Sequence, residues 1–256
     1  MIQLNYKSFG QGFPLIIIHG LFGTLDNWQT IAKLFAEKYS VFILDLRNHG
    51  RSPHVDGLFN YSILAEDIKD FMEQNWIYKA HLLGHSMGGK TAMQFALNYP
   101  EMVEKLVVVD IAPKSYKGGH EKILNALNSL DLNTLTDRKF AEAHLLKLLH
   151  ENSTVQFLLK NLSRKKEGGF EWKMNLSNLI ENYEHILDNI IIENHFDQPT
   201  LFIKGDKSDY ILEKDYNFIR SIFTNSKIIE IKEAGHWVHA DQPQELYNIV
   251  YEFLND

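Results

Sequence analysis

The chain has 256 residues, of which 45% are hydrophobic and 23% charged, and its formal net charge is −7. This length allows one large α/β domain with a substantial core, and the negative charge argues against a nucleic-acid partner. The sequence contains no cysteine, which excludes disulfides, thiolate metal sites and a cysteine nucleophile.

The first residues of the chain do not combine a charged segment with a long apolar stretch, as a secretory signal would. No run approaches the roughly 18 apolar residues that a membrane span needs. We therefore expect a cytoplasmic protein without a membrane partner. The composition leaves both a monomer and a homodimer open.

Short apolar runs that predict strands recur along the chain, and helical patterns lie between them. The runs are residues 15–18, 41–44, 79–83, 105–109, 200–203 and 227–231. The helical patterns are residues 28–35, 63–72, 90–99 and 242–254. Continuous apolar runs are typical of a parallel sheet that is covered on both faces, so the pattern predicts a mostly parallel central sheet flanked by helices.

The alternation of strands and helices stops between residues 113 and 196. Helical patterns fill this stretch, at residues 124–130, 140–149, 155–159 and 176–187. We expect an all-helical cap, inserted after the sixth strand, over the C-terminal edge of the sheet where open α/β sheets bind ligands. Residues 1–112 and 197–256 then form the core, and residues 113–196 form the cap.

The most informative motif is Gly84-His85-Ser86-Met87-Gly88, which fits the G-x-S-x-G nucleophile elbow. A predicted strand precedes the motif and a predicted helix follows it, as the elbow requires. The two glycines allow the strand and the helix to approach closely on either side of the serine. The motif predicts Ser86 as the nucleophile of a hydrolase.

A serine hydroxyl needs a general base to attack an acyl carbon. His236 is the best candidate, because it lies between the last predicted strand and the last predicted helix, where this fold places its histidine. His239 is a rival three residues later, but Gly235 favours His236 by allowing close approach of the backbone.

The acid that orients the histidine has two possible positions. Asp110 ends the strand that follows the nucleophile helix, and a carboxylate there is costly to bury without a partner such as a histidine N–H. The loop at residues 205–209 is the usual position, but its third residue after Gly205 is Ser208, and its carboxylates are Asp206 and Asp209. We favour Asp110 and keep Asp206 and Asp209 as alternatives.

The oxyanion hole needs two backbone N–H groups. One comes from Met87, directly after the nucleophile, and the other from Leu21 in the loop after the first predicted parallel strand. His81 and His85 are four residues apart but are separated by a strand and a turn, so they do not form a helical metal site. The sequence has no dinucleotide fingerprint and no phosphate-binding loop, so we expect neither a metal nor a cofactor.

Together these motifs resemble the YbfF-type esterases of the α/β-hydrolase superfamily. The matching segments span nearly the whole chain: residues 19–28 (HGLFGTLDNW), 45–50 (DLRNHG), 84–90 (GHSMGGK), 110–113 (DIAP), 155–160 (VQFLLK) and 235–240 (GHWVHA). The resemblance implies the α/β-hydrolase fold with a small helical cap, and a serine carboxylesterase active on short acyl esters or acyl-CoA thioesters. It also implies that the acid follows the nucleophile helix, at Asp110.

Three other functions compete with this prediction. A carbon–carbon bond hydrolase or a cofactor-free haloperoxidase would use a similar set of residues on the same fold. A non-catalytic binding module would keep the fold but not the catalytic chemistry. A dehalogenase or epoxide hydrolase is disfavoured, since it needs an aspartate at the position of Ser86.

Overall fold

The computed structural model describes residues 2–256 of the chain. Seven strands form a central sheet, in the spatial order β1 (Tyr6–Phe9), β3 (Tyr39–Leu44), β2 (Phe13–Ile18), β4 (Ala80–His85), β5 (Val103–Val109), β8 (Thr200–Gly205) and β9 (Ser226–Ile231). Only the edge strand β1 runs antiparallel to its neighbour, β3. The six other strands are mutually parallel, which confirms the predicted mostly parallel sheet.

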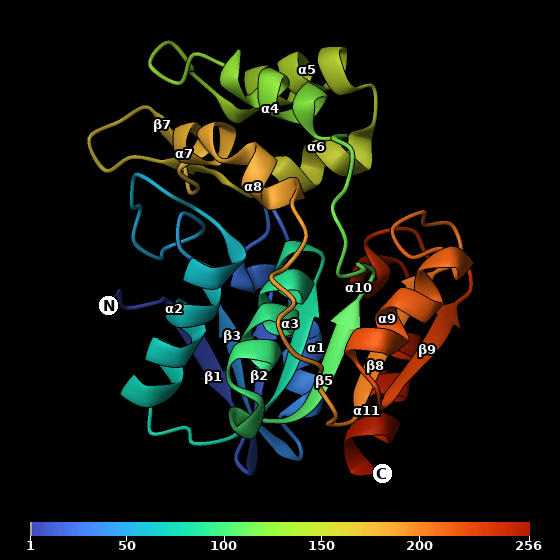
Figure 1. Cartoon of the computed structure of the whole chain (residues 1–256). Coiled ribbons are helices and arrows are strands. Elements are labelled where there is room, and N and C mark those ends of the chain that lie inside the picture. The colour runs from blue at the N-terminus through green and yellow to red at the C-terminus, as the bar shows by residue number, and fades with distance from the viewer. Residues whose placement is uncertain (1) are drawn as a thin grey trace.

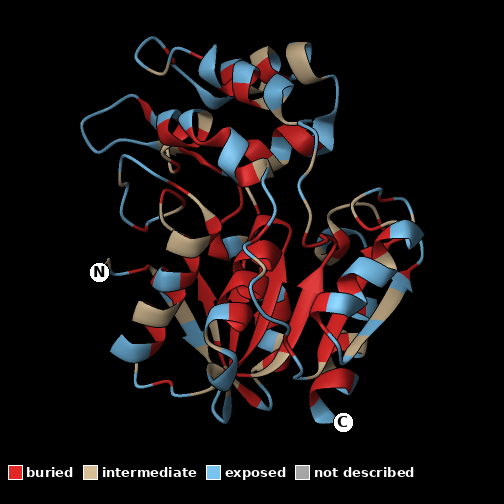
Figure 2. Cartoon of the chain, in the orientation of Figure 1, coloured by how far each residue is buried: buried red, intermediate tan, exposed pale blue. Residues whose placement is uncertain are grey.

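Helices cover both faces of the sheet because successive strand residues point to opposite sides. Ile16 and Ile18 of β2 pack with α2 (Tyr61–Gln74) and α3 (Met87–Asn98), whereas Leu15 and Ile17 pack on the opposite side with other helices. Those helices are α1 (Gln29–Phe35) and α11 (Pro243–Asn255). The strands between the two helical layers are the most buried part of the molecule (Figure 2).

Several shorter elements complete the core. They are the 3-10 turns η1 (Leu25–Asn27), η2 (Pro100–Met102) and η3 (Glu213–Asp215), and the helices α9 (Tyr216–Ile222) and α10 (Val238–Asp241). The helix α10 follows β9 and lies near the C-terminal end of the sheet, beside the position where β5 ends (Figure 1).

A long insertion separates β5 from β8 and lies above the C-terminal ends of the strands (Figure 1). Its elements are α4 (Glu121–Asn128), α5 (Arg138–Leu149), α6 (Asn152–Leu159), β6 (Leu162–Arg164), β7 (Phe170–Trp172), α7 (Leu176–Glu181) and α8 (Tyr183–Leu187). Helices therefore dominate the insertion, in agreement with the predicted helical patterns.

Two details of the insertion differ from the prediction. It is not wholly helical, because β6 and β7 form an antiparallel pair in which Leu162 lies opposite Trp172. Strands of three residues are too short to show an alternating pattern. The insertion also follows the fifth strand along the chain rather than the sixth, because only one strand, β1, precedes β2.

The chain returns from the insertion to the sheet through residues 188–199, here called the return segment, which descends in front of α3 (Figure 1). Two buried side chains of α3 fasten this part of the chain. Lys90 Nζ donates to the carbonyl oxygens of Leu187 (3.3 Å) and Asp188 (2.5 Å). The Gln94 amide exchanges two hydrogen bonds with the backbone of Ile191, at 2.7 and 3.2 Å. The nucleophile helix thus anchors one end of the insertion.

None of the helices within residues 2–256 combines the length and the apolar character that crossing a membrane would require.

Candidate active site

Ser86 lies at the tight turn between β4 and α3. Its backbone has φ 54° and ψ −121°, a conformation that a non-glycine residue seldom adopts. A Cβ on Gly84 would lie 2.2 Å from the carbonyl oxygen of Gly88, and one on Gly88 would lie 2.4 Å from that of Ile18. The glycines on both sides of the serine are therefore needed for the strand and helix to meet at this angle.

His236 reaches Ser86 from the loop between β9 and α10. Its Nε2 lies 2.9 Å from the Oγ of Ser86, and its Nδ1 lies 2.8 Å from Oδ2 of Asp110. Because a carboxylate accepts only, Nδ1 carries the proton and Nε2 is left to accept from the serine hydroxyl. The three side chains thus form one hydrogen-bonded chain, from Ser86 through His236 to Asp110.

Asp110 directly follows β5 and is fully buried. Its backbone also has a positive φ, 53°, and its N–H donates to the carbonyl of Ile203 at 2.7 Å. Besides His236, its carboxylate accepts the N–H of Gly205 at 3.0 Å and the hydroxyl of Ser208. Three donors therefore balance this buried charge.

The alternative acids lie elsewhere. Asp206 accepts the backbone N–H of Ala234 at 3.2 Å, and Asp209 is exposed and borders a cavity. Neither carboxylate is among the hydrogen-bond partners of His236 within residues 2–256. The rival histidine, His239, stacks on Trp28 with ring centroids 4.5 Å apart, and burial lowers its pKa to about 3.

The two amides predicted for an oxyanion hole lie at neighbouring turns. Met87 is the first residue of α3, so its N–H has no acceptor inside the helix. Leu21 lies in the turn after β2, which the Gly23 N–H closes on the carbonyl of Gly20 at 2.9 Å. Leu21 and Ser86 border the same two cavities.

His19 braces this turn and is not in the hydrogen-bonded chain of Ser86. Its Nδ1 donates to the Gly20 carbonyl at 2.8 Å, and its Nε2 accepts the N–H of Leu46 at 3.0 Å. Burial lowers the pKa of His19, which keeps the ring neutral and able to accept. Asp45 supports the same region, since Oδ1 accepts the N–H of Leu25 at 2.8 Å.

Three residues that the sequence reasoning did not assign also support His236. Ser208 occupies the usual acid position and donates to Asp110 instead. Tyr210 lies against the imidazole of His236, with ring centroids 3.8 Å apart and planes 16° from parallel. His85, whose pKa burial holds well below its usual range, donates from Nε2 to the carbonyl of His236 at 2.8 Å. The glycine-to-serine spacing in the loop after β8 was the only available signal for Ser208.

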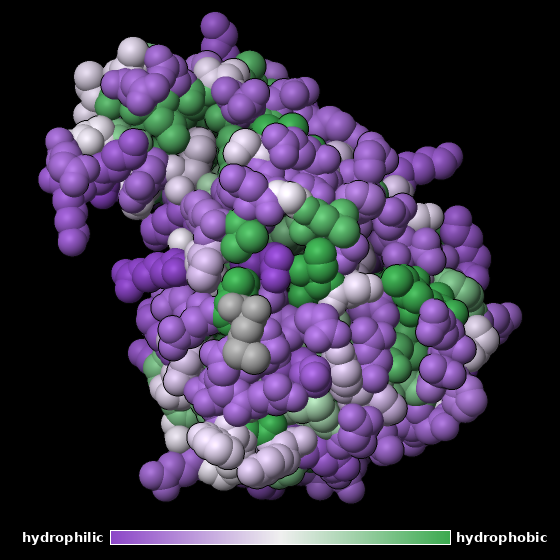
Figure 3. All heavy atoms as spheres, turned by 60° about the vertical axis from the view of Figure 1, so that its left-hand side comes forward, coloured by the Kyte–Doolittle hydropathy of each residue, from purple (hydrophilic) through white to green (hydrophobic). Residues whose placement is uncertain are grey.

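Two cavities meet at Ser86, and they share the residues Leu21, Ser86, His120 and Tyr210. The first, of about 220 Å³, is bordered by His236 and Trp237 and is here called the His236 cavity. The second, of about 230 Å³, is bordered by Lys90, Tyr61 and mostly apolar residues and is called the Lys90 cavity. In Figure 3, hydrophobic residues are exposed on the molecular surface in the region between the insertion and the core.

Among residues 2–256, no group of three or more histidine, aspartate or glutamate side chains is arranged to hold a metal ion.

The fold and the site define an α/β hydrolase. Residues 14–243 match the family described as "alpha/beta hydrolase fold", and the chain belongs to this family. Within it the chain is a YbfF-type enzyme: it is 36% identical to "Esterase YbfF" of Escherichia coli over 95% of this chain and 93% of that protein. The chain is accordingly a hydrolase.

Other relatives extend over most of the chain as well. A "Putative esterase/lipase" of Haemophilus influenzae is 40% identical over 94% of this chain and 83% of its own length. The "sn-1-specific diacylglycerol lipase ABHD11" of Danio rerio is 37% identical over 99% of this chain and 83% of its own length. Among solved structures, a "Marine microorganism esterase" superimposes with a TM-score of 0.96 at 40% identity, covering 99% of this chain and 100% of that one.

Proposed function

We propose that this enzyme is a serine carboxylesterase that hydrolyses short-chain acyl esters through an acyl-enzyme on Ser86. The observation that carries the proposal is the chain of hydrogen bonds from Ser86 to His236 (2.9 Å) and from His236 to Asp110 (2.8 Å). Relatives named as esterases and lipases support the same reaction class.

In the first half of the reaction, Nε2 of His236 takes the proton of the Ser86 hydroxyl while Oγ bonds to the ester carbonyl carbon. The carbonyl oxygen becomes an oxyanion, and we assign its stabilisation to the N–H groups of Leu21 and Met87. The intermediate then collapses: the bond to the alcohol oxygen breaks, and that oxygen takes the proton from His236. The acyl group remains on Ser86.

In the second half, His236 takes a proton from water, whose oxygen bonds to the acyl carbon. The second oxyanion collapses, Oγ leaves with the proton from His236, and the acid is released. Asp110 holds the imidazole in the required tautomer and stabilises the imidazolium in both halves. Thioesters would react by the same steps with a thiol as leaving group, so acyl-CoA compounds belong in the substrate test.

We also propose that residues 113–196 act as the cap of this site. Residues of the insertion border both cavities: Phe157 and Leu158 border the His236 cavity, and Ile186 and Leu187 border the Lys90 cavity. The insertion thereby covers Ser86, which is 8% exposed, and shapes the space on each side of it.

The proposal is tested with p-nitrophenyl acetate and butyrate, a series of acyl-CoAs and a fluorophosphonate probe. We expect ester turnover and a probe adduct on Ser86, and we expect Ser86→Ala to abolish both. Activity retained by Ser86→Ala would refute the proposal. An inert wild-type enzyme without an adduct would indicate a binding module, and turnover confined to carbon–carbon bond substrates would indicate that related hydrolase class.

A further inference from the structure

The two cavities at Ser86 are not equivalent, because His236 borders only one of them. His236 has to deliver its proton to the leaving atom, which is the alcohol oxygen of an ester or the thiol sulfur of a thioester. The alcohol or thiol half of the substrate must therefore lie on the His236 side. The acyl half then extends into the other space, the Lys90 cavity. This assignment rests on the proposed esterase mechanism.

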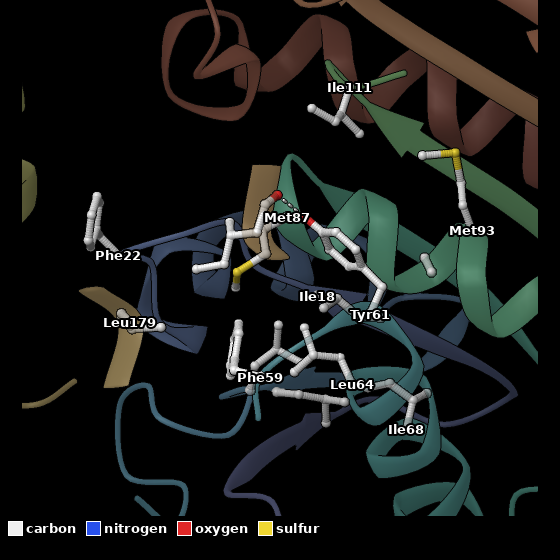
Figure 4. Close-up of a cluster of buried hydrophobic side chains, with 14 of the residues drawn as sticks. Ile18, Phe22, Phe59, Tyr61, Leu64, Ile68, Met87, Met93, Ile111 and Leu179 are labelled. Atoms are coloured by element: carbon white, nitrogen blue, oxygen red, sulfur yellow. Dashed lines mark hydrogen bonds between the residues drawn. The ribbon is translucent and has the colours of Figure 1, made fainter. Parts of the chain in front are cut away.

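The Lys90 cavity is apolar over most of its wall. Its lining includes the apolar side chains of Met87, Ile111 and Ile186 and the rings of Tyr61, Tyr116 and Tyr210. Tyr61, Met87 and Ile111 belong to the buried cluster drawn in Figure 4, where the dashed line marks the bond from the Tyr61 hydroxyl to the Ile186 carbonyl. Such a wall suits the methylene groups of an acyl chain.

Lys90 introduces a charge into this apolar wall. It lies four residues after Ser86, so both residues are on the same side of the start of α3. Lys90 is only 1% exposed. Of the other charged residues that border the cavity, Lys117 and Asp209 are exposed, so they do not share the buried position of Lys90.

The ammonium of Lys90 has no carboxylate partner within 4 Å among residues 2–256. Its contacts are the carbonyl oxygens of Leu187 and Asp188 and the faces of Tyr61 and Tyr116, with Nζ 5.2 and 4.8 Å from the two ring centroids. The side chain of Asp188 itself is exposed and pairs with His185. Two carbonyls leave the third N–H of the ammonium free of a backbone acceptor.

A buried cation is normally paired with a negative charge, because leaving it unpaired in an apolar site is costly. Burial is the main reason why the pKa of Lys90 is lowered, to about 7; the exposed Asp188 carboxylate raises this pKa without offsetting the burial, and the charge of Lys114 lowers it further. A carboxylate in the cavity would supply the missing charge and would favour the protonated form. Carbonyl dipoles and tyrosine faces attract the ammonium less strongly than a carboxylate does.

We propose that the acyl group of the preferred substrate ends in a carboxylate that pairs with Lys90, so that the enzyme hydrolyses half-esters of dicarboxylic acids. The acyl methylenes lie against the apolar wall between Ser86 and Lys90. The uncharged alcohol or thiol half occupies the His236 cavity. Lys90 is then a specificity-determining residue, one helical turn behind the nucleophile.

The test compares two ethyl esters of equal acyl length, monoethyl glutarate and ethyl valerate, by pH-stat titration at pH 7. We expect kcat/KM of the wild type to be at least tenfold higher for the half-ester. The Lys90→Met variant should reduce this preference by about tenfold or more, since a charge-assisted pair contributes about 1.5–3 kcal/mol.

Gln94→Met is the matched control. Gln94 is buried on α3 and fastens the return segment at Ile191, as Lys90 fastens it at Asp188, but it does not border the Lys90 cavity. The control should therefore keep the preference for the half-ester. A preference lost equally in both variants would assign Lys90 to anchoring the return segment and overturn the proposal.

A measurement on the wild type alone covers the case in which Lys90→Met does not fold. Glutarate should inhibit ethyl valerate hydrolysis with an inhibition constant at least tenfold below that of valerate. Equal inhibition, or equal hydrolysis of the two esters, would refute the role of Lys90 while leaving the esterase proposal intact. The esterase proposal itself fails only if neither ester is hydrolysed in a Ser86-dependent manner.

Discussion

Tyr210 lies face to face on His236, with ring centroids 3.8 Å apart and planes 16° from parallel. Two hydrogen bonds fix the backbone of Tyr210: its carbonyl accepts the Tyr116 hydroxyl at 2.8 Å, and its N–H donates to Ser208 Oγ at 3.3 Å. The imidazole therefore has an aromatic face on one side when it becomes an imidazolium. An aromatic face in this position stabilises a cation.

We predict that Tyr210→Leu lowers kcat for p-nitrophenyl butyrate by roughly tenfold, since a desolvated cation–π contact contributes about 1–2 kcal/mol and 1.4 kcal/mol corresponds to tenfold. Tyr210→Phe preserves the stacked ring and should stay within about threefold of the wild type. Steady-state kinetics of the two variants provide the measurement. A wild-type kcat in Tyr210→Leu would show that the stack does not contribute to the chemical steps.

Asp110 should be the acid that orients His236. We predict that Asp110→Asn lowers kcat by about 10⁴-fold, by analogy with the same change in serine proteases, because the amide favours the wrong imidazole tautomer. Asp206→Asn is the control, since an asparagine carbonyl can still accept the N–H of Ala234. A comparable loss in Asp206→Asn or Asp209→Asn, with Asp110→Asn active, would assign the acid to the loop after β8.

Gly88 has no room for a side chain at the elbow. A Cβ at this position would lie 2.4 Å from the carbonyl oxygens of both Ile18 and His19, which are backbone atoms of β2 and the turn after it. We predict that Gly88→Ala reduces the free energy of unfolding by about 1–3 kcal/mol, as overpacking does. Urea unfolding is the measurement. Gly118→Ala, where the nearest atoms belong to the Glu121 side chain, should have little effect.

His49 should make the fold sensitive to acid. It is completely buried, its Nδ1 donates to the Arg47 carbonyl at 3.0 Å, and burial lowers its pKa to about 3. An unfolded histidine has a pKa of about 6.5, so between pH 6.5 and 3 the unfolded chain binds one more proton than the folded chain at this residue. Stability is therefore lost as the pH falls through this range.

We predict that this residue contributes a slope of about 1.4 kcal/mol per pH unit to the free energy of unfolding. His49→Gln retains a donor near the Arg47 carbonyl and removes the titration, so its unfolding free energy should decline less steeply between pH 6.5 and 5. Urea unfolding at several pH values measures both slopes. Identical slopes would exclude His49 as a source of acid sensitivity.

Much of the fold and the candidate site could be predicted because local patterns mark them. The apolar runs of β2, β4 and β5 are bounded by polar or glycine residues, and Ser86 and Asp110 stand directly after two of these runs. His236 could be placed because it follows the last strand. Each of these positions depends on short-range sequence context.

The remaining features depend on contacts between segments that are distant along the chain. Ser208 is 98 residues from Asp110, and no local pattern indicates that its hydroxyl reaches the carboxylate. Lys90 lies on a helix, where a lysine is usually exposed, and it is covered by the end of α8 and the start of the return segment, 97 and 98 residues later. The strands β6 and β7 are three residues each, too short for a pattern to appear.

The two positive-φ residues that directly follow β4 and β5, Ser86 and Asp110, are joined through the hydrogen bonds between these strands. Val109 pairs with His85, and the N–H of Ser86 donates to the Val109 carbonyl at 3.0 Å, so the serine and the aspartate are fixed to each other by main chain. His236 is not part of these strands; it lies in the loop between β9 and α10. As temperature rises, the weakest part of the site should therefore be the loop at residues 232–237, and heat should stop turnover by detaching the base while nucleophile and acid keep their spacing.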